Sequence, residues 1–445
     1  MNYIDRMQKI AVLGAAGKMG SGITALTLIE CTDLSLLPEN KDKTFVLYAI
    51  DLSEESLNNL LSYLKTQLIK SAEKKINWLR ETLKFNQNLI ENTDFINKYI
   101  EQALTILRLS SRIESAYNAN VIFEAVIENP SLKIDLFKNI NTNNKNNPWF
   151  LTNTSSIPIK YLNDNANLDG KIIGYHFYNP PVVQKLLEII PTENTLPDLK
   201  EFAHTLAKKL KKTIVEANDV AGFIGNGHFM RDIIYAINEC EKLSQKFSLP
   251  ESIFIINKIT QEYLIRPMGI FQLIDYVGLD VCTYILKVMN EHLNDNTLKA
   301  PLLEKFLEKG IKGGQNPDGT QKNGIFKYEK GKIIGIFDLT SNNYIDIESI
   351  KEKCEKEIGP IPSKIKPWKQ IISLQNKEQL LEEYFNELKN LNTFGAKLAL
   401  NYLKNSKEIG KYLVKTGVAK NEDDVNTVLI TGFYHAYGPI NNFIE

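Results

Sequence analysis

The stretch GYHFYNPPVVQKLLEII, residues 174–190, places a histidine and a glutamate among apolar neighbours. A buried strand would favour Val or Leu at His176 and Glu188, because burying a carboxylate without a partner is costly. Histidine titrates near neutral pH, so it can accept or donate a proton during a reaction. A carboxylate against one ring nitrogen would fix its tautomer and stabilise the imidazolium. The stretch is therefore typical either of acid–base chemistry or of two satisfied polar groups in a core.

A glycine-rich turn near the N-terminus is suited to binding a pyrophosphate. KIAVLGAAGKMGSGI, residues 9–23, indicates a short buried strand, a turn and the start of a helix. A helix N-terminus presents unpaired N–H groups, and glycines let the backbone approach a ligand. The spacing Gly-x-x-Gly-x-x-Gly is one residue longer than the common dinucleotide-binding pattern, and a turn that binds nothing is the alternative. The cofactor contacts expected here are Gly14, Ala15, Gly17, Lys18, Met19 and Gly20.

A second strand, FVLYAID at 45–51, ends in Asp51. A carboxylate at this place can accept hydrogen bonds from the adenosine ribose, and it would repel the 2′-phosphate of NADP. The pattern therefore predicts NAD as the cofactor. The intervening CTDLSLLPENKDKT, residues 31–44, is expected to be a loop or an insertion.

Bulk composition narrows the class of protein. The 445 residues include 43% hydrophobic and 24% charged residues, which is ordinary for a globular protein. Lys+Arg and Asp+Glu both number 53, so the basic excess of a nucleic-acid-binding protein is lacking. No run approaches the roughly 18 apolar residues of a membrane helix. We expect a cytoplasmic enzyme or binding protein without a metal site, because the cysteines form no C-x-x-C pair and read as free thiols: Cys31, Cys240, Cys282 and Cys354.

Strand and helix patterns alternate over the first half of the chain, which indicates an α/β domain on a largely parallel sheet. A helical insertion at about 53–109 interrupts the pattern, and the chain rejoins the sheet at NVIFEAVIE, residues 120–128. Four further strands are expected in WFLTNTSS, KIIGYHF, LLEII and TIVEA. We therefore predict a Rossmann-type domain over residues 1–217.

The second half of the chain is predominantly helical in pattern. We predict an all-α C-terminal domain over 218–330 and a second helical domain over 331–445, with a loop and hairpin at 313–332. A shift of 169 residues places Asn257 on Asn426 and Gly269 on Gly438. The second helical domain is thus expected to be a degenerate repeat of the first.

Seven tracts, in order, resemble motifs of the L-3-hydroxyacyl-CoA dehydrogenase family, and they cover residues 9 to about 330 with gaps. The most specific feature is NTSS ahead of HFYNP, followed by a glutamate and then by GFIGN. The tracts are GAAGKMGSGI, IFEAVIENPSLKIDLF, LTNTSSIPI, GYHFYNPPVVQKLLEII, NDVAGFIGN, RPMGIFQLIDYVGLDV and GTQKNGIFKY.

The resemblance assigns roles to individual residues. It implies that His176 is the general acid/base at the substrate's 3-hydroxyl and that Glu188 is its paired carboxylate. Ser155 and Asn226 fall on positions that contact the substrate near the reacting carbon. The positions around the nicotinamide half of NAD are Glu128, Lys133, Ser155, Asn179 and Lys322. Helices in the region 60–108 help such enzymes to bind coenzyme A, and the candidate basic residues there are Lys65, Lys70, Lys74 and Lys75.

The residue types alone also allow purely structural roles for several of these residues. Ser155 could be a polar strand end, Asn226 a helix N-cap, and Glu128 with Lys133 a surface pair. The other histidines are expected to be structural, although His228 lies close to Asn226 in sequence.

The resemblance predicts reversible NAD-dependent oxidation of L-3-hydroxyacyl-CoA in fatty-acid β-oxidation or butanoate metabolism. The alternatives are a dehydrogenase of a hydroxy acid without coenzyme A and an inactive nucleotide-binding relative. An acyl-CoA substrate is the expected partner, with no nucleic acid and no membrane insertion. The chain is expected to be a monomer with an internal repeat or a homodimer.

Overall fold

The computed structural model describes residues 2–316, 319–363 and 366–444. The chain divides into two compact units, residues 1–219 and 220–445. Within the described ranges, no helix is both long and apolar enough to cross a membrane. The separation of the second unit into domains at about residue 330 stays a prediction.

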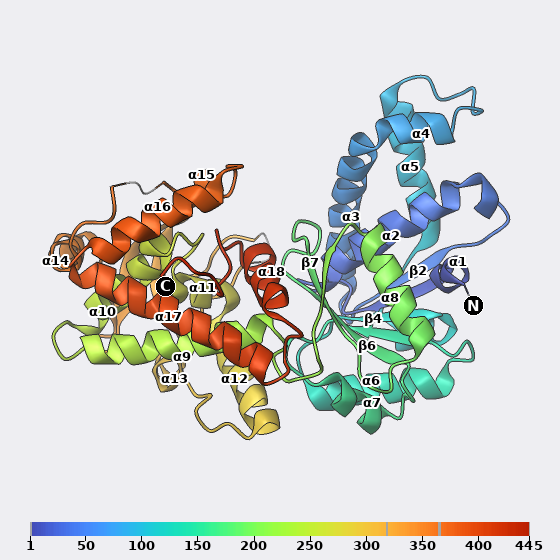
Figure 1. Ribbon diagram of the computed structural model, residues 1–445. Helices are drawn as coiled ribbons and strands as arrows, with labels where there is room; N and C mark the ends of the chain where they lie inside the picture. The colour runs from blue at the N-terminus through green and yellow to red at the C-terminus, as the bar shows by residue number, and fades with distance from the viewer. Residues whose placement is uncertain (1, 317–318, 364–365, 445) are drawn as a thin grey trace. The chain divides into compact units, whose positions relative to one another are not determined.

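The first unit is built on one sheet, which contains eight strands among the described residues, in the order β3-β2-β1-β4-β5-β6-β7-β8 (Figure 1). Neighbouring strands are parallel except for β6 and β7, which pair antiparallel. The predicted Rossmann-type sheet is thus confirmed. The strands are β1 Lys9–Leu13, β2 Val46–Ile50, β3 Leu107–Ser110, β4 Val121–Glu124, β5 Trp149–Thr152, β6 Ile172–Phe177, β7 Leu186–Ile190 and β8 Thr213–Glu216.

Helices connect these strands, and three of them form the insertion between β2 and β3. In Figure 1, α3, α4 and α5 rise as an arm from the end of the sheet that carries β2. The buried leucines of α3 recur every three or four residues, so they form one apolar stripe against α2 and α5. The helices are α1 Tyr3–Met7, α2 Gly20–Leu36, α3 Glu54–Lys74, α4 Ile76–Thr82, α5 Asn92–Ile106, α6 Pro130–Asn143, α7 Ile159–Ala166 and α8 Pro197–Lys209, with 3-10 turns at Pro38–Asn40 and Ile113–Asn118.

The loop expected after Glu30 is wrong for its first part, because α2 continues to Leu36. Cys31 and Leu34 are buried one turn apart, and the hydroxyl of Thr32 donates to the carbonyl of Leu28 at 2.7 Å. Burial of these apolar side chains therefore stabilises the helix through a segment that also contains several polar residues.

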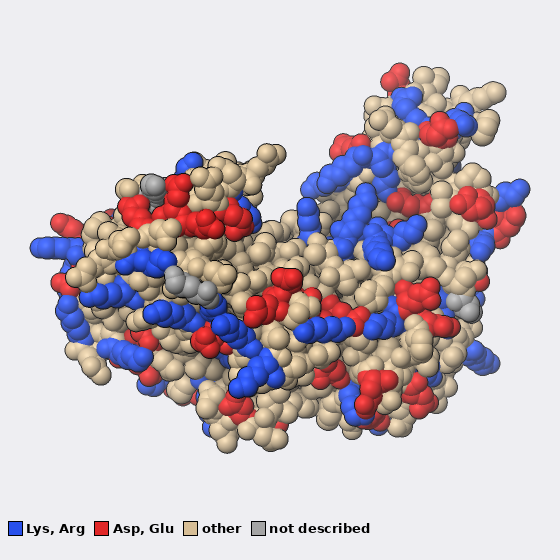
Figure 2. Space-filling model, viewed as in Figure 1, with Lys and Arg blue, Asp and Glu red and all other residues tan. Residues whose placement is uncertain are grey.

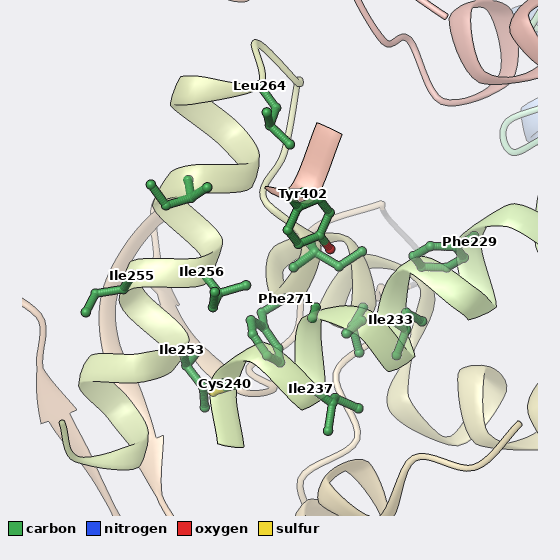
Figure 3. Packing of buried hydrophobic residues seen from close by; sticks show 14 of the residues in the cluster. Phe229, Ile233, Ile237, Cys240, Ile253, Ile255, Ile256, Leu264, Phe271 and Tyr402 are labelled. Atoms are coloured by element: carbon green, nitrogen blue, oxygen red, sulfur yellow. The ribbon is translucent and has the colours of Figure 1, made fainter. Parts of the chain in front are cut away.

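The second unit is largely helical, as predicted. Its core forms where α9 packs on α10 and α17, and Figure 3 shows the apolar side chains of these helices meeting. Phe229, Ile233, Ile237 and Cys240 are spaced by three and four residues along α9. The helices are α9 Gly225–Leu243, α10 Leu249–Lys258, α11 Ile270–Val277, α12 Leu279–Leu293, α13 Pro301–Glu308, α14 Glu348–Ile358, α15 Trp368–Ile371, α16 Lys377–Asn390, α17 Phe394–Lys415 and α18 Glu422–Gly432, with a π turn at Ile259–Tyr263.

The expectation of an all-α second unit is wrong in one respect, because it contains a small antiparallel sheet. The expected hairpin is present as β9 Phe326–Glu329 and β10 Lys332–Asp338, and a third strand, β11 Asn343–Asp346, joins it. The buried carboxylate of Asp275 on α11 accepts from the N–H groups of Ile325 and Phe326 at 2.7 and 2.8 Å. Burial raises the pKa of Asp275 to about 7. A contact about 50 residues away along the chain therefore anchors this sheet, and no local pattern reveals it.

The two segments related by the 169-residue shift share an unusual local geometry. A Cβ at Gly269 would lie 2.3 Å from Oδ1 of Asn257, and one at Gly438 would lie 2.2 Å from Oδ1 of Asn426. Each asparagine also accepts a backbone N–H just beyond its glycine, from Gln272 or Ile440, at 3.0 Å. The same asparagine–glycine contact at both places supports the proposed repeat.

We expect Gly269→Ala and Gly438→Ala each to lower the free energy of unfolding by about 3 kcal/mol, because the new methyl group displaces a hydrogen-bonded asparagine. The midpoint of urea denaturation measures this. Gly331→Ala is the control: its Cβ meets nothing within 4 Å, although its φ is +78°, so it should cost only about 1 kcal/mol. A Gly438→Ala protein no less stable than this control would contradict the shared geometry.

Candidate active site

His176 and Glu188 face each other on the antiparallel strands β6 and β7. The strand register pairs them directly, and directly paired residues point to the same face of a sheet. Nδ1 of His176 lies 2.9 Å from Oε2 of Glu188, a hydrogen-bond distance. Glu188 is 0% exposed and His176 is 8% exposed. The carboxylate of Glu188 therefore holds the Nδ1 nitrogen of the imidazole ring.

Strand alternation explains why these two polar groups share a face. Tyr175, Phe177, Leu187 and Ile189 point to the other face, where they join the apolar core. Gly174 lies on the histidine's face, where a Cβ would come within 3.0 Å of side chains on α7 and β7. The missing side chain lets α7 pack closely beside this strand pair.

Tyr178 also contacts the His176–Glu188 pair, although the sequence motifs did not predict it as a site residue. Its hydroxyl donates to Oε2 of Glu188 at 2.8 Å, and its ring centroid lies 4.9 Å from that of His176. Burial and the charge of Glu188 raise the pKa of Tyr178 well above its ordinary range, so the phenol stays protonated. The signal in the sequence was the spacing of two residues from His176, which places both on one face.

Glu128 and Lys133 belong to a buried charge network, so the surface-pair alternative is wrong. Lys133 is 1% exposed, and its Nζ lies 2.6 Å from Oε1 of Glu124 and 3.2 Å from Oε2 of Glu128. Burial alone would lower the pKa of Lys133, but the two carboxylates outweigh it and raise the pKa. Oε1 of Glu128 accepts from the hydroxyl of Thr154 and from the N–H of Ser155, at 2.6 and 2.9 Å. The network therefore fixes the loop that carries Ser155.

Glu124, at the end of β4, is a second residue of the site that the sequence motifs did not predict. Besides binding Lys133, it accepts a hydrogen bond from the hydroxyl of Thr152 on β5 at 2.5 Å. A glutamate within the apolar run NVIFEAVIE was the available signal, since a carboxylate in a buried strand requires a partner. The structure buries Glu124 completely.

The glycine turn closes tightly between β1 and α2. A Cβ at Gly20 would lie 1.9 Å from the carbonyl oxygen of Gly14, and Gly14 itself has φ of +71°. Oδ2 of Asp51 accepts the N–H of Ala16 at 2.9 Å, so the extra residue of the turn is tied to the end of β2. This backbone cradle before a helix N-terminus fits a dinucleotide pyrophosphate. The turn also contains Ala15, Gly17, Lys18 and Met19.

The remaining nominated residues lie in loops or at a helix start. Ser155 follows β5 and Asn179 follows β6, both partly buried in the first unit. Asn226 is in the first turn of α9, whose N-cap is Ile224, so the N-cap alternative is wrong. Lys322 is exposed in the loop before β9. Asn226 and Lys322 belong to the second unit, and their roles stay predictions.

Two of the other histidines, His204 and His228, contact neighbouring side chains. Nε2 of His204 lies 3.0 Å from a carboxylate oxygen of Glu216. His228 is buried, its Nε2 lies 3.2 Å from the hydroxyl oxygen of Ser406, and burial lowers its pKa to about 4. His228 therefore stays neutral and joins α9 to α17.

Known proteins resemble the chain over most of its length. Residues 9–220 match the family model "3-hydroxyacyl-CoA dehydrogenase, NAD binding domain", and residues 222–323 match the corresponding C-terminal domain. A probable 3-hydroxybutyryl-CoA dehydrogenase of Bacillus subtilis is 30% identical over 70% of this chain and 96% of its own length. The mitochondrial hydroxyacyl-coenzyme A dehydrogenase of Homo sapiens is 28% identical over 71% of this chain and 91% of its own.

One solved structure resembles the chain beyond these two family domains. The 3-hydroxybutyryl-CoA dehydrogenase of Escherichia coli superposes on 98% of this chain and 90% of its own, with a TM-score of 0.63 and 17% identity. At that identity the likeness concerns the fold alone. It includes residues that follow the second family domain, which ends at residue 323.

We expect Gly20→Ala to weaken NADH binding by at least about tenfold, because the added Cβ forces the turn away from the helix N-terminus. Calorimetric titration of the purified protein with NADH measures the Kd. Ser21→Ala, at the half-buried neighbouring position, should leave the Kd unchanged. Equal Kd values for the wild type and Gly20→Ala would contradict the placement of the pyrophosphate in this turn.

Proposed function

Since the chain belongs to the 3-hydroxyacyl-CoA dehydrogenase family, we propose that it oxidises an L-3-hydroxyacyl-CoA to the 3-oxoacyl-CoA with NAD, reversibly. The observation that carries this proposal is the buried pair of His176 and Glu188, with Nδ1 and Oε2 2.9 Å apart. The pair lies in the same unit as the glycine turn, on the adjacent strands β6 and β7.

In this mechanism His176 moves one proton. Its Nε2 takes the proton of the substrate's 3-hydroxyl during oxidation and returns it during reduction. NAD, when bound, supplies the hydride acceptor. Glu188 keeps the ring in the tautomer that leaves Nε2 unprotonated, and its charge stabilises the imidazolium that forms. Because Glu188 is completely buried, little solvent screens this interaction.

Ser155 and Asn226 orient the substrate near the reacting carbon in this proposal. The backbone of Ser155 is held by Glu128, which is held in turn by Lys133. We therefore assign Glu128 and Lys133 to the support of this loop as well as to the nicotinamide side of the site. Asn179 and Lys322 stay proposed cofactor contacts.

The arm of the first unit is the proposed contact for coenzyme A. In Figure 2, Lys and Arg side chains gather over and beside α3, and Lys65, Lys70 and Lys74 are exposed on that helix. Such cations suit the phosphates of coenzyme A. Lys75 is a weaker candidate, because its Nζ already lies 2.6 Å from Asp33 and 3.1 Å from the hydroxyl of Tyr99.

A hydroxy acid without coenzyme A is the alternative substrate, and an inactive nucleotide-binding protein is the alternative class. The intact His176–Glu188 hydrogen bond favours an active enzyme over the latter. The exposed lysines of α3 favour a substrate that carries phosphates. A cytoplasmic location and a place in fatty-acid or butanoate metabolism belong to the same proposal.

Acetoacetyl-CoA and NADH provide the direct test. We expect the wild type to oxidise NADH in the presence of acetoacetyl-CoA, and His176→Gln to lower kcat by about 10²- to 10⁴-fold, because the proton donor is lost. The absorbance of NADH measures turnover. His292→Gln, the same substitution at an exposed histidine of α12, is the control and should be fully active. No turnover by folded wild type would contradict the function, and equal turnover by His176→Gln would contradict its role.

We also propose that the second helical copy takes the place of a partner subunit, so that the chain is a monomer. Helix α17 of the second copy packs along α9 of the first, and the hydroxyl of Tyr402 donates to the carbonyl of Asp232 at 3.2 Å. Light scattering coupled to gel filtration should give a mass near 50.7 kDa. A stable species of twice that mass would contradict the proposal.

A further inference from the structure

One carboxylate oxygen at the centre of the site accepts two side-chain hydrogen bonds. Oε2 of Glu188 lies 2.9 Å from Nδ1 of His176 and accepts from the hydroxyl of Tyr178 at 2.8 Å. His176 and Tyr178 are two residues apart at the end of β6, so both point to the face on which Glu188 lies. A histidine and a phenol therefore share the same acceptor atom.

The strand on the other side of Glu188 places a neutral side chain beside it. On β8, the residue paired with Glu188 is Val215. The next residue, Glu216, points to the opposite face, where it pairs with Lys200 and His204. Just after β5, Oδ1 of Asn153 accepts the N–H of Phe177 at 2.8 Å, which holds the end of β6. The titratable side chains hydrogen-bonded to Oε2 include His176 and Tyr178.

We propose that Tyr178 is a positioning residue of the catalytic pair, which acts through Glu188 and weakens the hold of that carboxylate on the proton of His176. A hydrogen bond to a carboxylate disperses its negative charge and lowers its basicity. A less basic Glu188 stabilises the imidazolium less, so His176 releases its proton more readily. The inference rests on the proposed function, because it concerns the strength of the acid used in the reduction.

The hydroxyl also fixes the place of the carboxylate. Glu188 has rotatable side-chain bonds, and a second donor 2.8 Å from Oε2 holds that oxygen opposite Nδ1. Tyr178 therefore affects proton transfer without touching the reacting carbon. A role in packing alone would be preserved by phenylalanine, which keeps the ring.

The test is Tyr178→Phe, which removes only the hydroxyl, followed through the pH dependence of kcat/KM for acetoacetyl-CoA reduction. This rate falls as pH rises, because the reduction needs the imidazolium form of His176. We expect the falling limb to move to higher pH by about 0.5 unit, and the low-pH plateau to fall about threefold, since a weaker acid transfers its proton more slowly. The KM for NADH should not change.

Tyr175→Phe is the matched control. It removes a hydroxyl from the same strand, but Tyr175 points to the opposite face, where it donates to the carbonyl of Ala203 at 3.2 Å. Its pH limb should match that of the wild type. A Tyr178→Phe limb that does not move, a uniform loss of rate at every pH, or an equal movement in Tyr175→Phe would each overturn the proposal.

A second measurement separates this inference from the proposed function. The proton on Nδ1 of His176 gives an NMR resonance that can be assigned by its loss in His176→Gln. Without the competing hydroxyl, the bond to Glu188 should shorten and the resonance should move downfield in Tyr178→Phe only. An unmoved resonance would overturn the inference even if the wild type reduces acetoacetyl-CoA. A moved resonance in a protein without turnover would support the inference and contradict the function.

Discussion

The first unit depends on one constraint: a carboxylate buried in a sheet must be given hydrogen bonds, or it destabilises the fold. Glu188 meets this requirement with two donors from the neighbouring strand, His176 and Tyr178. The antiparallel pairing of β6 and β7 makes the contact possible, because its register sets residues 176 and 188 opposite each other. Those two strands are the place where the otherwise parallel sheet reverses direction. The reversal therefore creates the candidate catalytic pair.

The same constraint organises the residues around the pair. Glu124 and Glu128 are compensated by the buried Lys133, and the hydrogen bonds they accept extend to the loop of Ser155. Asp51 receives a backbone N–H from the glycine turn. Each carboxylate thus ties the end of one strand to an adjacent segment, which fixes loops that would otherwise be free to move. In the second unit, Asp275 does the same for the small sheet.

The repeat proposed for the second unit rests on one shared local geometry. The contact of an asparagine with a glycine is retained at 257 with 269 and at 426 with 438, because any side chain at the glycine would collide with the amide. Helix α17 supplies Tyr402, which donates to the backbone of α9, and Ser406, which contacts the side chain of His228 on α9. In the proposed monomer, such contacts take the place of contacts between subunits.

Sequence alone determined the class of the first unit, the predominance of helix in the second and the family, because hydrophobic periodicity and glycine spacing are local signals. It also nominated His176 and Glu188, since a histidine and a glutamate stand out in apolar strands. It carried a signal for Tyr178 and Glu124, in the spacing of one and the apolar neighbours of the other, but it could not show which strand lies alongside and therefore which partners they meet. It carried no local signal for the sheet anchored by Asp275. The helix through Cys31 and Leu34 was misjudged for the same reason. Register and burial decide which side chains meet, and both are properties of the tertiary structure.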